Sequence, residues 1–295
     1  MKILVTGANG QLGKEICACL SRGYTELGVP DVLKQPNDVL GIDIGDCDLS
    51  DIGALRAFLG ERTFDVIINC AAFTNVNACE SEKEAAMRAN AIAPRNLAIL
   101  AEETGAKLIH VSTDYVFAGD GTEPLAEYEP KNPQSVYGKT KHLGEEYIMQ
   151  ETGRFFIVRT AWLYGYYGKN FVKTMLHIAR EKGACRVVCD QRGNPTNAAD
   201  LAHHLLKLAT TEEYGIYHGT GSGECSWYEF TQKIVEYAGI DATVSPCSTE
   251  EFPSPAKRPA YSSLDNLMFR VTVGDEFRPW EEALHSFFRN GGDNE

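Results

Sequence analysis

The sequence predicts an α/β protein built on a doubly wound parallel sheet, and three observations carry this prediction. Short β-branched runs alternate with helical stretches in the first half of the chain, beginning with KILVTG and QLGKEICACLSRG. A turn containing three glycines, VTGANGQLGKE, joins that first run to the first helix. The alternation then repeats until FFIVRTAWLYG. Such a repeat is typical of a parallel sheet with helices on both faces.

The expected elements follow one another in pairs. We expect strands at residues 2–7, 38–43, 65–72, 107–113 and 155–165, and helices at 11–23, 54–62, 84–105 and 137–153. Pro94 lies inside the third of these helices, where a missing N–H and a ring clash predict a bend or a local break.

The pattern loosens after about residue 160. Three amphipathic helices are expected at residues 169–183, 199–213 and 227–240, separated by Gly-rich and Pro-rich connections. We therefore expect a dinucleotide-binding domain over residues 1–160 and a mainly substrate-binding, smaller α/β domain over 161–295. The chain is expected to return to the sheet near residues 185–210.

Composition and charge narrow the class of protein. The 295 residues carry 28 Lys and Arg against 41 Asp and Glu, a net charge of −13. Nucleic acid and anionic membranes demand a basic surface, so neither is an expected main partner. No apolar run approaches the ~20 residues of a membrane span, and the N-terminus does not resemble a secretory signal, so we expect a cytoplasmic protein. The nine scattered cysteines contain no CxxC pair, which indicates reduced thiols.

The glycine-rich turn predicts a phosphate site. Gly7, Gly10 and Gly13 stand between the first strand and the first helix in GxxGxxG spacing. Glycines there allow a tight turn, close approach of a pyrophosphate and packing of helix on sheet, and the N–H groups at the helix start face the phosphates. This is the pattern of a Rossmann-type dinucleotide-binding domain.

Such a domain also needs an acidic residue at the end of its second strand, to bind the adenosine ribose. Asp43 fits, although it lies 30 residues beyond Gly13 instead of ~20. We therefore expect residues 24–38 to form an inserted loop. Asp43 would repel a 2′-phosphate and mildly favours NADH, but the choice between NADH and NADPH stays open.

A second motif predicts proton transfer. Tyr137 and Lys141 in VYGKTK lie on one face of a helix, and an ammonium beside a phenol lowers the phenol pKa. A tyrosine so placed can exchange a proton with a carbonyl or alcohol. The strand ending in Ser112-Thr113 precedes Tyr137 by about 24 residues. The combination with the glycine turn is specific for an oxidoreductase site.

These motifs resemble the extended short-chain dehydrogenase/reductase family over essentially the whole chain. The resemblance includes CDLSD, DVIINCAAFTNVNACE, HVSTDYVFAG, RTAWLYG, DQRGNPTNAADLA and KRPAYSSLDN. Within the family, the sequence most strongly resembles the branch that reduces the C4 ketone of dTDP-4-dehydro-L-rhamnose. This resemblance implies a dTDP-sugar substrate and NADPH or NADH as cofactor. The cofactor-binding residues implied by the resemblance or the motifs are Gly7, Gly10, Gln11, Leu12, Gly13, Asp43, Asp48, Leu49, Ala71, Ala72, Phe73, Val111, Tyr137 and Lys141.

The same resemblance assigns catalytic and substrate-binding roles. Thr113, Tyr137 and Lys141 match the catalytic trio, and Thr113, Asp114, Trp162 and Arg258 match or suggest substrate-binding positions. Tyr137 would donate a proton to the C4 oxyanion while Thr113 hydrogen-bonds that oxygen. Lys141 would lower the pKa of Tyr137 and hold the nicotinamide ribose hydroxyls. Asp114 would position the sugar instead of acting as an acid.

Three further expectations stay open. The scaffold also supports other nucleotide-sugar 4-ketoreductases, epimerases and dehydratases, but a dehydratase carries Asp-Glu after the strand-end Thr, where this chain has Asp114-Tyr115. A non-catalytic regulatory subunit, like that of methionine adenosyltransferase, resembles the same branch. Some relatives hold Mg²⁺ with glutamates at a dimer interface, and Glu15 matches one such position. The chain is therefore expected as a monomer or a homodimer.

Overall fold

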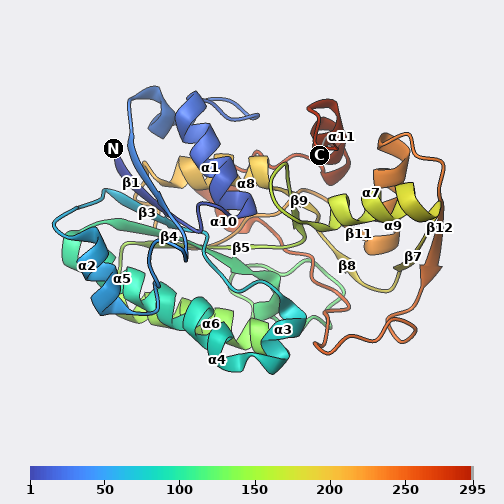
Figure 1. The fold of residues 1–295 in the computed structure, drawn as a ribbon, viewed down its shortest axis with the longest axis horizontal. Helices are drawn as coiled ribbons and strands as arrows, with labels where there is room; N and C mark the ends of the chain where they lie inside the picture. The colour runs from blue at the N-terminus through green and yellow to red at the C-terminus, as the bar shows by residue number, and fades with distance from the viewer. Residues whose placement is uncertain (294–295) are drawn as a thin grey trace.

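A parallel sheet of six strands forms the centre of the molecule. The computed structural model describes residues 1–293, and its strand order is β10-β5-β4-β3-β1-β2 (Figure 1). The strands are β1 (Lys2–Thr6), β2 (Asp38–Ile42), β3 (Val66–Asn69), β4 (Lys107–Thr113), β5 (Phe155–Thr160) and β10 (Gly215–His218). All neighbouring pairs are parallel. The predicted fold class is confirmed.

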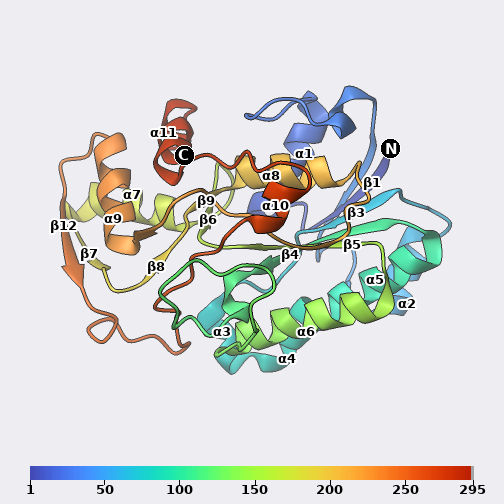
Figure 2. The same ribbon diagram turned by 180° about the vertical axis from the view of Figure 1, so that it is seen from behind.

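Helices cover both faces of this sheet. The helices α1 (Gln11–Arg22), α8 (Ala198–Leu208) and α10 (Leu267–Val271) lie on one face, and α2 (Ile52–Leu59), α5 (Ala93–Thr104) and α6 (Val136–Glu151) lie on the other (Figures 1 and 2). Ile3 and Val5 of β1 face the first group, while Leu4 faces the second. Alternate residues of one buried strand therefore pack into two separate hydrophobic cores, one on each face of the sheet.

The long helical stretch predicted at residues 84–105 is interrupted. It consists of α4 (Lys83–Met87), a π-helical turn at Arg88–Ile92 and α5. Pro94 lies in the first turn of α5, where it has no N–H to donate to the Asn90 carbonyl four residues earlier. Gly144 of α6 packs against that carbonyl, since a Cβ at Gly144 would lie 2.2 Å from Asn90 O. The predicted local break at Pro94 is what lets α6 approach closely.

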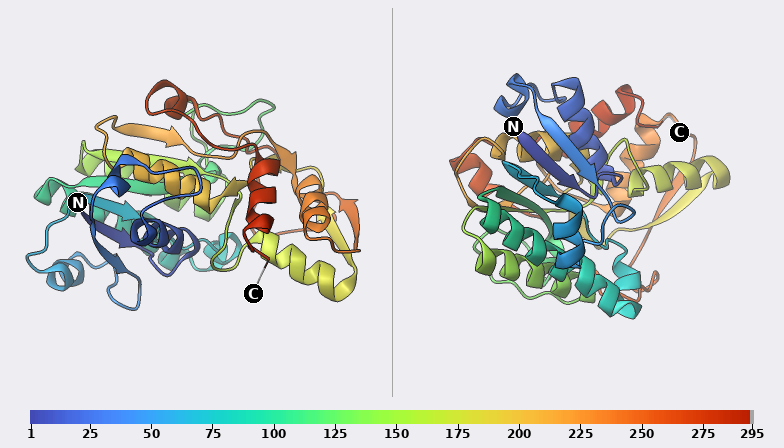
Figure 3. Two further views of the ribbon diagram at one scale, coloured as in Figure 1. Left: turned by 90° about the horizontal axis from the view of Figure 1, so that it is seen from above. Right: turned by 60° about the vertical axis from the view of Figure 1, so that its left-hand side comes forward.

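The C-terminal part packs at one end of the sheet (Figure 3). It contains α7 (Phe171–Lys182), α9 (Trp227–Tyr237), α11 (Trp280–Arg289) and the parallel pair β7 (Ala184–Val188) and β12 (Thr243–Cys247). Smaller elements are α3 (Val76–Ser81), β6 (Leu163–Tyr164), β8 (Arg192–Gly193), β9 (Thr196–Asn197), β11 (Cys225–Ser226) and short 3₁₀ turns at Asp31–Lys34 and Asp114–Val116. After β7, α8 packs on one face of the sheet and β10 joins the edge of the sheet beside β5.

The helices of residues 1–293 include none that is both long and apolar enough to cross a membrane. All nine cysteines are free thiols, as their spacing predicted.

A buried ion pair attaches α6 to the sheet. Arg159 of β5 donates to both carboxylate oxygens of Glu145, at 2.8 and 2.9 Å, and Ser112 Oγ of β4 donates to the same carboxylate at 2.5 Å. Both charged side chains are fully buried. The guanidinium holds the pKa of Glu145 well below its usual range, although burial alone would raise it. One carboxylate therefore fixes the position of α6 relative to two strands.

Removing one partner of this pair should destabilise the protein strongly. Arg159→Met leaves a buried carboxylate without its counter-charge, which costs about 3–5 kcal/mol of unfolding free energy. Urea unfolding followed by circular dichroism measures this loss. The matched control is Lys34→Met, because the Lys34–Asp31 pair is 65% and 72% exposed and such pairs contribute at most about 1 kcal/mol. Equal effects of the two substitutions would contradict the structural role of the buried pair.

Candidate active site

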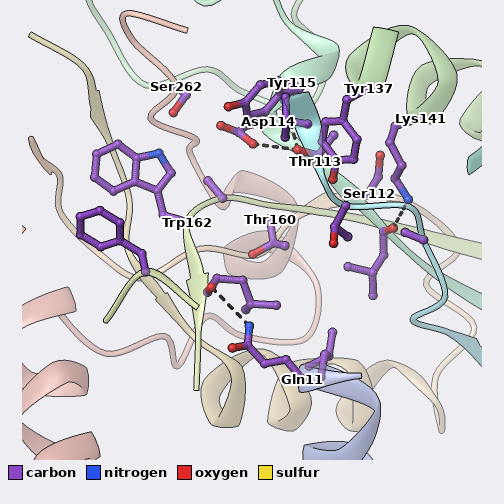
Figure 4. Close-up of a pocket in the computed structure, with 18 of the residues that line it drawn as sticks. Gln11, Ser112, Thr113, Asp114, Tyr115, Tyr137, Lys141, Thr160, Trp162 and Ser262 are labelled. Atoms are coloured by element: carbon purple, nitrogen blue, oxygen red, sulfur yellow. Dashed lines mark hydrogen bonds between the residues drawn. The ribbon is translucent and has the colours of Figure 1, made fainter. Parts of the chain in front are cut away.

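A cavity of about 640 Å³ opens where β1, β3, β4 and β5 end and the C-terminal part begins. It is lined by residues of the glycine turn, by the end of β4, by the start of α6 and by Trp162 and Arg258 (Figure 4). A second hollow of about 640 Å³ adjoins it and shares Asn9, Gly10, Cys70 and Ala72 with it. The carboxyl ends of parallel strands are the usual ligand sites of such sheets.

The glycine turn has the shape that a pyrophosphate needs. Gly7 has a φ of +65°, and a Cβ there would lie 2.7 Å from the backbone nitrogen of Ala71. A Cβ at Gly13 would lie 2.1 Å from Gly7 O, so Gly13 allows α1 to pack on the turn. Gly10 caps α1, and Gln11 and Leu12 line the cavity at the helix start. The backbone N–H groups there fit a dinucleotide pyrophosphate.

The second hollow contains the residues expected at the adenosine end. Asp43 follows β2 directly and accepts a hydrogen bond from the Asn9 N–H at 2.9 Å. The predicted residues that line this hollow are Gly7, Gly10, Asp43, Asp48, Leu49, Ala71, Ala72 and Phe73. Arg88 lines it as well, from the π-helical turn 45 residues beyond Asp43 in sequence. Sequence reasoning could not place this cation, because only the fold brings it to the hollow that Asp43 also lines.

Thr113, Tyr137 and Lys141 converge on the main cavity. Thr113 ends β4, Tyr137 lies in the first turn of α6, and Figure 4 shows the Tyr137 ring beside Thr113. Lys141 lies one turn further along α6, and its Nζ donates to Val111 O at 2.6 Å. All three side chains are buried. The predicted trio is therefore assembled at one place.

The electrostatics of Tyr137 differ from the expectation. Burial raises the pKa of the Tyr137 phenol, and a hydrogen bond with Thr113 opposes that rise. The predicted lowering by Lys141 is not found, because the lysine nitrogen is turned toward Val111 O and His110. Burial lowers the pKa of Lys141 to about 8. A phenol in this state stays protonated at neutral pH and so can act as a proton donor.

The polar cluster after Thr113 faces the same cavity. Asp114 accepts a hydrogen bond from Thr113 Oγ1 at 2.8 Å, and burial raises its pKa to about 6. Its second oxygen is buried without a partner. Tyr115 packs edge-on against Tyr137, and its hydroxyl accepts a hydrogen bond from Arg258 at 3.2 Å. Asp114 and Arg258 therefore present one unpartnered acceptor and one cation to the cavity.

Trp162 forms the opposite wall. Its ring stacks on Trp227 of α9, with centroids 3.5 Å apart and planes 5° from parallel. With a φ of 48°, it is the one residue other than glycine in the left-handed region among residues 1–293. A non-glycine residue pays for this conformation, which therefore needs surrounding contacts to maintain it. Those contacts include the Trp227 ring.

The lining residues that sequence reasoning missed include Thr160, Gln191, Trp227 and Ser262. Thr160 ends β5 directly opposite Thr113 in the sheet register, and its buried hydroxyl has no partner. Its position at a strand end was a usable signal. The other three residues belong to the C-terminal part, where no periodic sequence pattern indicates which way a side chain points.

The structure does not support a metal at Glu15. Its side chain is 1% exposed and bonded to Arg22 at 3.0 Å, and burial raises its pKa. Residues 1–293 contain no group of three or more His, Cys, Asp or Glu side chains that could hold a metal ion. The Mg²⁺ prediction is therefore without a site in the described part of the chain.

The family model described as "RmlD substrate binding domain" matches residues 1–291. Two solved structures match the structure of this chain, and each match covers 98% of this chain and 99% of the other chain. The dTDP-4-dehydrorhamnose reductase from Clostridium acetobutylicum is 45% identical with a TM-score of 0.92, and that from Bacillus anthracis, in complex with NADP, is 40% identical with a TM-score of 0.91. Fold and site thus define an NAD(P)-dependent oxidoreductase of the short-chain dehydrogenase/reductase class.

Relatives of known name define the family within this class of oxidoreductases. The chain is 38% identical to a dTDP-4-dehydrorhamnose reductase from Streptomyces griseus, over 97% of this chain and 92% of the relative. It is 40% identical to a spore coat polysaccharide biosynthesis protein from Bacillus subtilis, over 98% and 97%. The chain belongs to the RmlD family, the family of the dTDP-4-dehydrorhamnose reductases.

The proposed role of the glycine turn in dinucleotide binding can be tested by adding one methyl group. Gly13→Ala brings a Cβ against Gly7 O, so we expect a loss of about 1–3 kcal/mol of stability and a loss of the thermal shift that NADPH causes in the wild type. Gly153→Ala is the matched control, since no atom lies within 4 Å of its Cβ. Dinucleotide binding by the Gly13→Ala variant at wild-type affinity would contradict the assignment of the turn.

Proposed function

We propose that the protein reduces the C4 ketone of dTDP-4-dehydro-L-rhamnose to dTDP-L-rhamnose with NADPH or NADH. The observation that carries the proposal is the convergence of Thr113, Tyr137 and Lys141 in one cavity beside the glycine turn. The family supports the same reaction, since several relatives bear the name dTDP-4-dehydrorhamnose reductase. In this proposal residues 1–160, with the returning segment, bind the dinucleotide, and residues 161–295 mainly bind the sugar nucleotide.

Tyr137 and Thr113 act at the C4 oxygen in the proposal, and Lys141 would hold the nicotinamide ribose hydroxyls, as the resemblance implies. A bound dinucleotide supplies the hydride that reaches C4. Tyr137 donates its phenol proton to the C4 oxygen, and Thr113 hydrogen-bonds the same oxygen as its charge develops. Because burial raises the pKa of Tyr137, the phenol is protonated before the reaction begins.

The remaining cavity residues would hold the sugar nucleotide. The unpartnered oxygen of Asp114 and the free hydroxyl of Thr160 suit the hydroxyl groups of a sugar. Arg258 lies where it can pair with a diphosphate through a bidentate contact. The Trp162 ring offers an apolar face to the deoxysugar.

Asp43 and Arg88 bear on the choice of cofactor. A carboxylate at the end of β2 favours a free 2′-hydroxyl, while a guanidinium in the same hollow favours a 2′-phosphate. The combination supports use of both NADH and NADPH. The Bacillus anthracis relative was solved with NADP.

A direct assay tests the reaction. The purified protein is given dTDP-4-dehydro-L-rhamnose with NADH or NADPH, and dinucleotide oxidation is followed at 340 nm. A panel of other dTDP-4-keto sugars measures specificity, because one relative is named a probable dTDP-4,6-dihydroxy-2-methyloxan-3-one 4-ketoreductase. Dehydration of dTDP-glucose without net cofactor turnover would overturn the proposal. Inactivity toward every keto sugar would favour a regulatory subunit.

Removing the phenol should abolish turnover without disturbing the fold. Tyr137→Phe is expected to lower kcat by about 10²–10⁴-fold, the usual contribution of a general acid, while dinucleotide affinity and thermal stability stay near wild type. Tyr128→Phe is the matched control because the Tyr128 side chain is 76% exposed. Undiminished activity of the Tyr137→Phe variant would exclude Tyr137 as the proton donor.

A further inference from the structure

A buried chain of polar side chains lies behind Lys141 and is not used by the proposed mechanism. It crosses the sheet from β1 through β3 and β4 to α6, and its members are Thr6, Asn69, His110 and Lys141. All four side chains are at most 1% exposed. A fully satisfied buried network of this kind fixes the direction of each hydrogen bond.

The orientation of Asn69 follows from its neighbours. Its side-chain oxygen accepts from Thr6 Oγ1 at 2.6 Å and from the Ala71 backbone N–H at 3.1 Å. A backbone N–H can only donate, so the oxygen cannot exchange places with the amide nitrogen. The Asn69 nitrogen therefore faces His110 Nδ1, at 2.8 Å, and donates to it.

This contact determines the tautomer of His110. Because Nδ1 accepts a hydrogen bond, the ring proton of the neutral imidazole must be on Nε2. Burial and the neighbouring Lys141 lower the pKa of His110 well below its usual value, so the ring is neutral. Nε2 lies 3.1 Å from Lys141 Nζ. The ring thus directs an N–H at the lysine nitrogen.

An N–H directed at Lys141 favours the uncharged amine. The ammonium form has three N–H donors and no lone pair, whereas the amine can accept a hydrogen bond from His110 Nε2–H and still donate one to Val111 O. The other groups near Lys141 do not reverse this preference. Burial lowers the Lys141 pKa by more than the charge of Glu145, one turn along α6, raises it, and the Glu145 oxygens are bonded to Arg159 and Ser112. The Cys70 thiol is protonated because burial raises its pKa, and the Tyr137 phenol is neutral.

We propose that His110 is a positioning residue that is held by Asn69 as the Nε2–H tautomer and stabilises the amine form of Lys141, so that Lys141 returns a proton to Tyr137 in each turnover. The inference rests on the proposed reductase function for its catalytic consequence. The lowered pKa of Lys141, about 8, agrees with it.

The proton balance is complete. The Tyr137 O–H bond breaks as the C4 oxygen takes the proton, which leaves a phenolate. An N–H bond of the Lys141 ammonium then breaks, and its proton reaches the phenolate through water in the cavity that both side chains line, because Lys141 Nζ itself faces Val111 O and His110. The resulting amine accepts the hydrogen bond from His110 Nε2–H. The amine takes one proton from solvent before the next turnover. Each ketone reduced therefore consumes one hydride from the dinucleotide and one proton from water.

The first test measures the pKa of Lys141 directly, by NMR titration of the [¹³C]lysine-labelled protein with Lys141→Met to assign the signal. His110→Met fills the space without an N–H, and its expected effect is a rise in the Lys141 pKa of about one unit, the worth of one hydrogen bond. His110→Gln retains an N–H at the position of Nε2 and should keep the wild-type value. An unchanged pKa in His110→Met would overturn the proposal.

The second test reads the tautomer in the wild-type protein, so it does not depend on whether a variant folds. Nitrogen shifts of [¹⁵N]histidine-labelled protein should show His110 protonated at Nε2 alone, down to about pH 5, well below the ordinary histidine pKa of ~6.5. A proton on Nδ1, or an imidazolium, would overturn the inference. Neither NMR test needs turnover, so a failed reductase assay and a failed inference are distinguishable.

Kinetics then connect the network to catalysis. Reduction needs the Lys141 ammonium as proton source, so kcat should fall as the pH rises through the Lys141 pKa. In His110→Met this basic limb should move up by about one pH unit, and in His110→Gln it should stay in place. A loss of kcat at all pH values without a moved limb would indicate a merely structural role and would overturn the proposal.

Discussion

The attachment of α6 to the sheet is the constraint on which the site depends. Tyr137 and Lys141 both lie on this helix, whereas Thr113 ends β4, so the three side chains proposed to react meet only if helix and strand keep one relative position. The Glu145 carboxylate supplies that position by bonding to Arg159 of β5 and Ser112 of β4 at once. The close approach of Gly144 to Asn90 O adds a second point of contact. A buried pair with this geometry specifies one arrangement, because any shift would leave a charge unpaired.

Burial dominates the chemistry of the cavity. The protein carries a net charge of −13, yet few of those charges reach the site. Removal from water raises the pKa of Asp114 to about 6 and lowers that of Lys141 to about 8, so both groups approach the neutral range. The same effect keeps Tyr137 protonated. A low-dielectric site therefore adjusts several proton-exchanging groups without an additional charged residue.

The local predictions were accurate where one short segment carries the whole signal. The glycine turn, the end of β2 at Asp43 and the break near Pro94 all lie where we expected them, because each follows from steric rules that act over a few residues. The helix α11 was missed although it is strongly amphipathic, since it lies beyond the strand–helix alternation that guided the reading. Thr160 was missed although its position at a strand end was a usable signal, whereas Trp227 was missed because an aromatic residue on a helix carries no sign of which cavity it faces.

By itself, the sequence determined the class of the fold and the position of the glycine turn, since these depend on glycine geometry and strand–helix periodicity, while the resemblance to a known family supplied the roles proposed for Thr113, Tyr137 and Lys141. Only the tertiary structure decided the charge state of that trio. Lys141 does not lower the pKa of Tyr137, because it turns to Val111 O and His110, two groups brought to it by β4. Arg88 likewise reaches the hollow that contains Asp43 only through the packing of the helical stretch on the sheet. Hydrogen-bond direction and desolvation depend on what surrounds a side chain, and those surroundings come from strands and helices far apart in the chain.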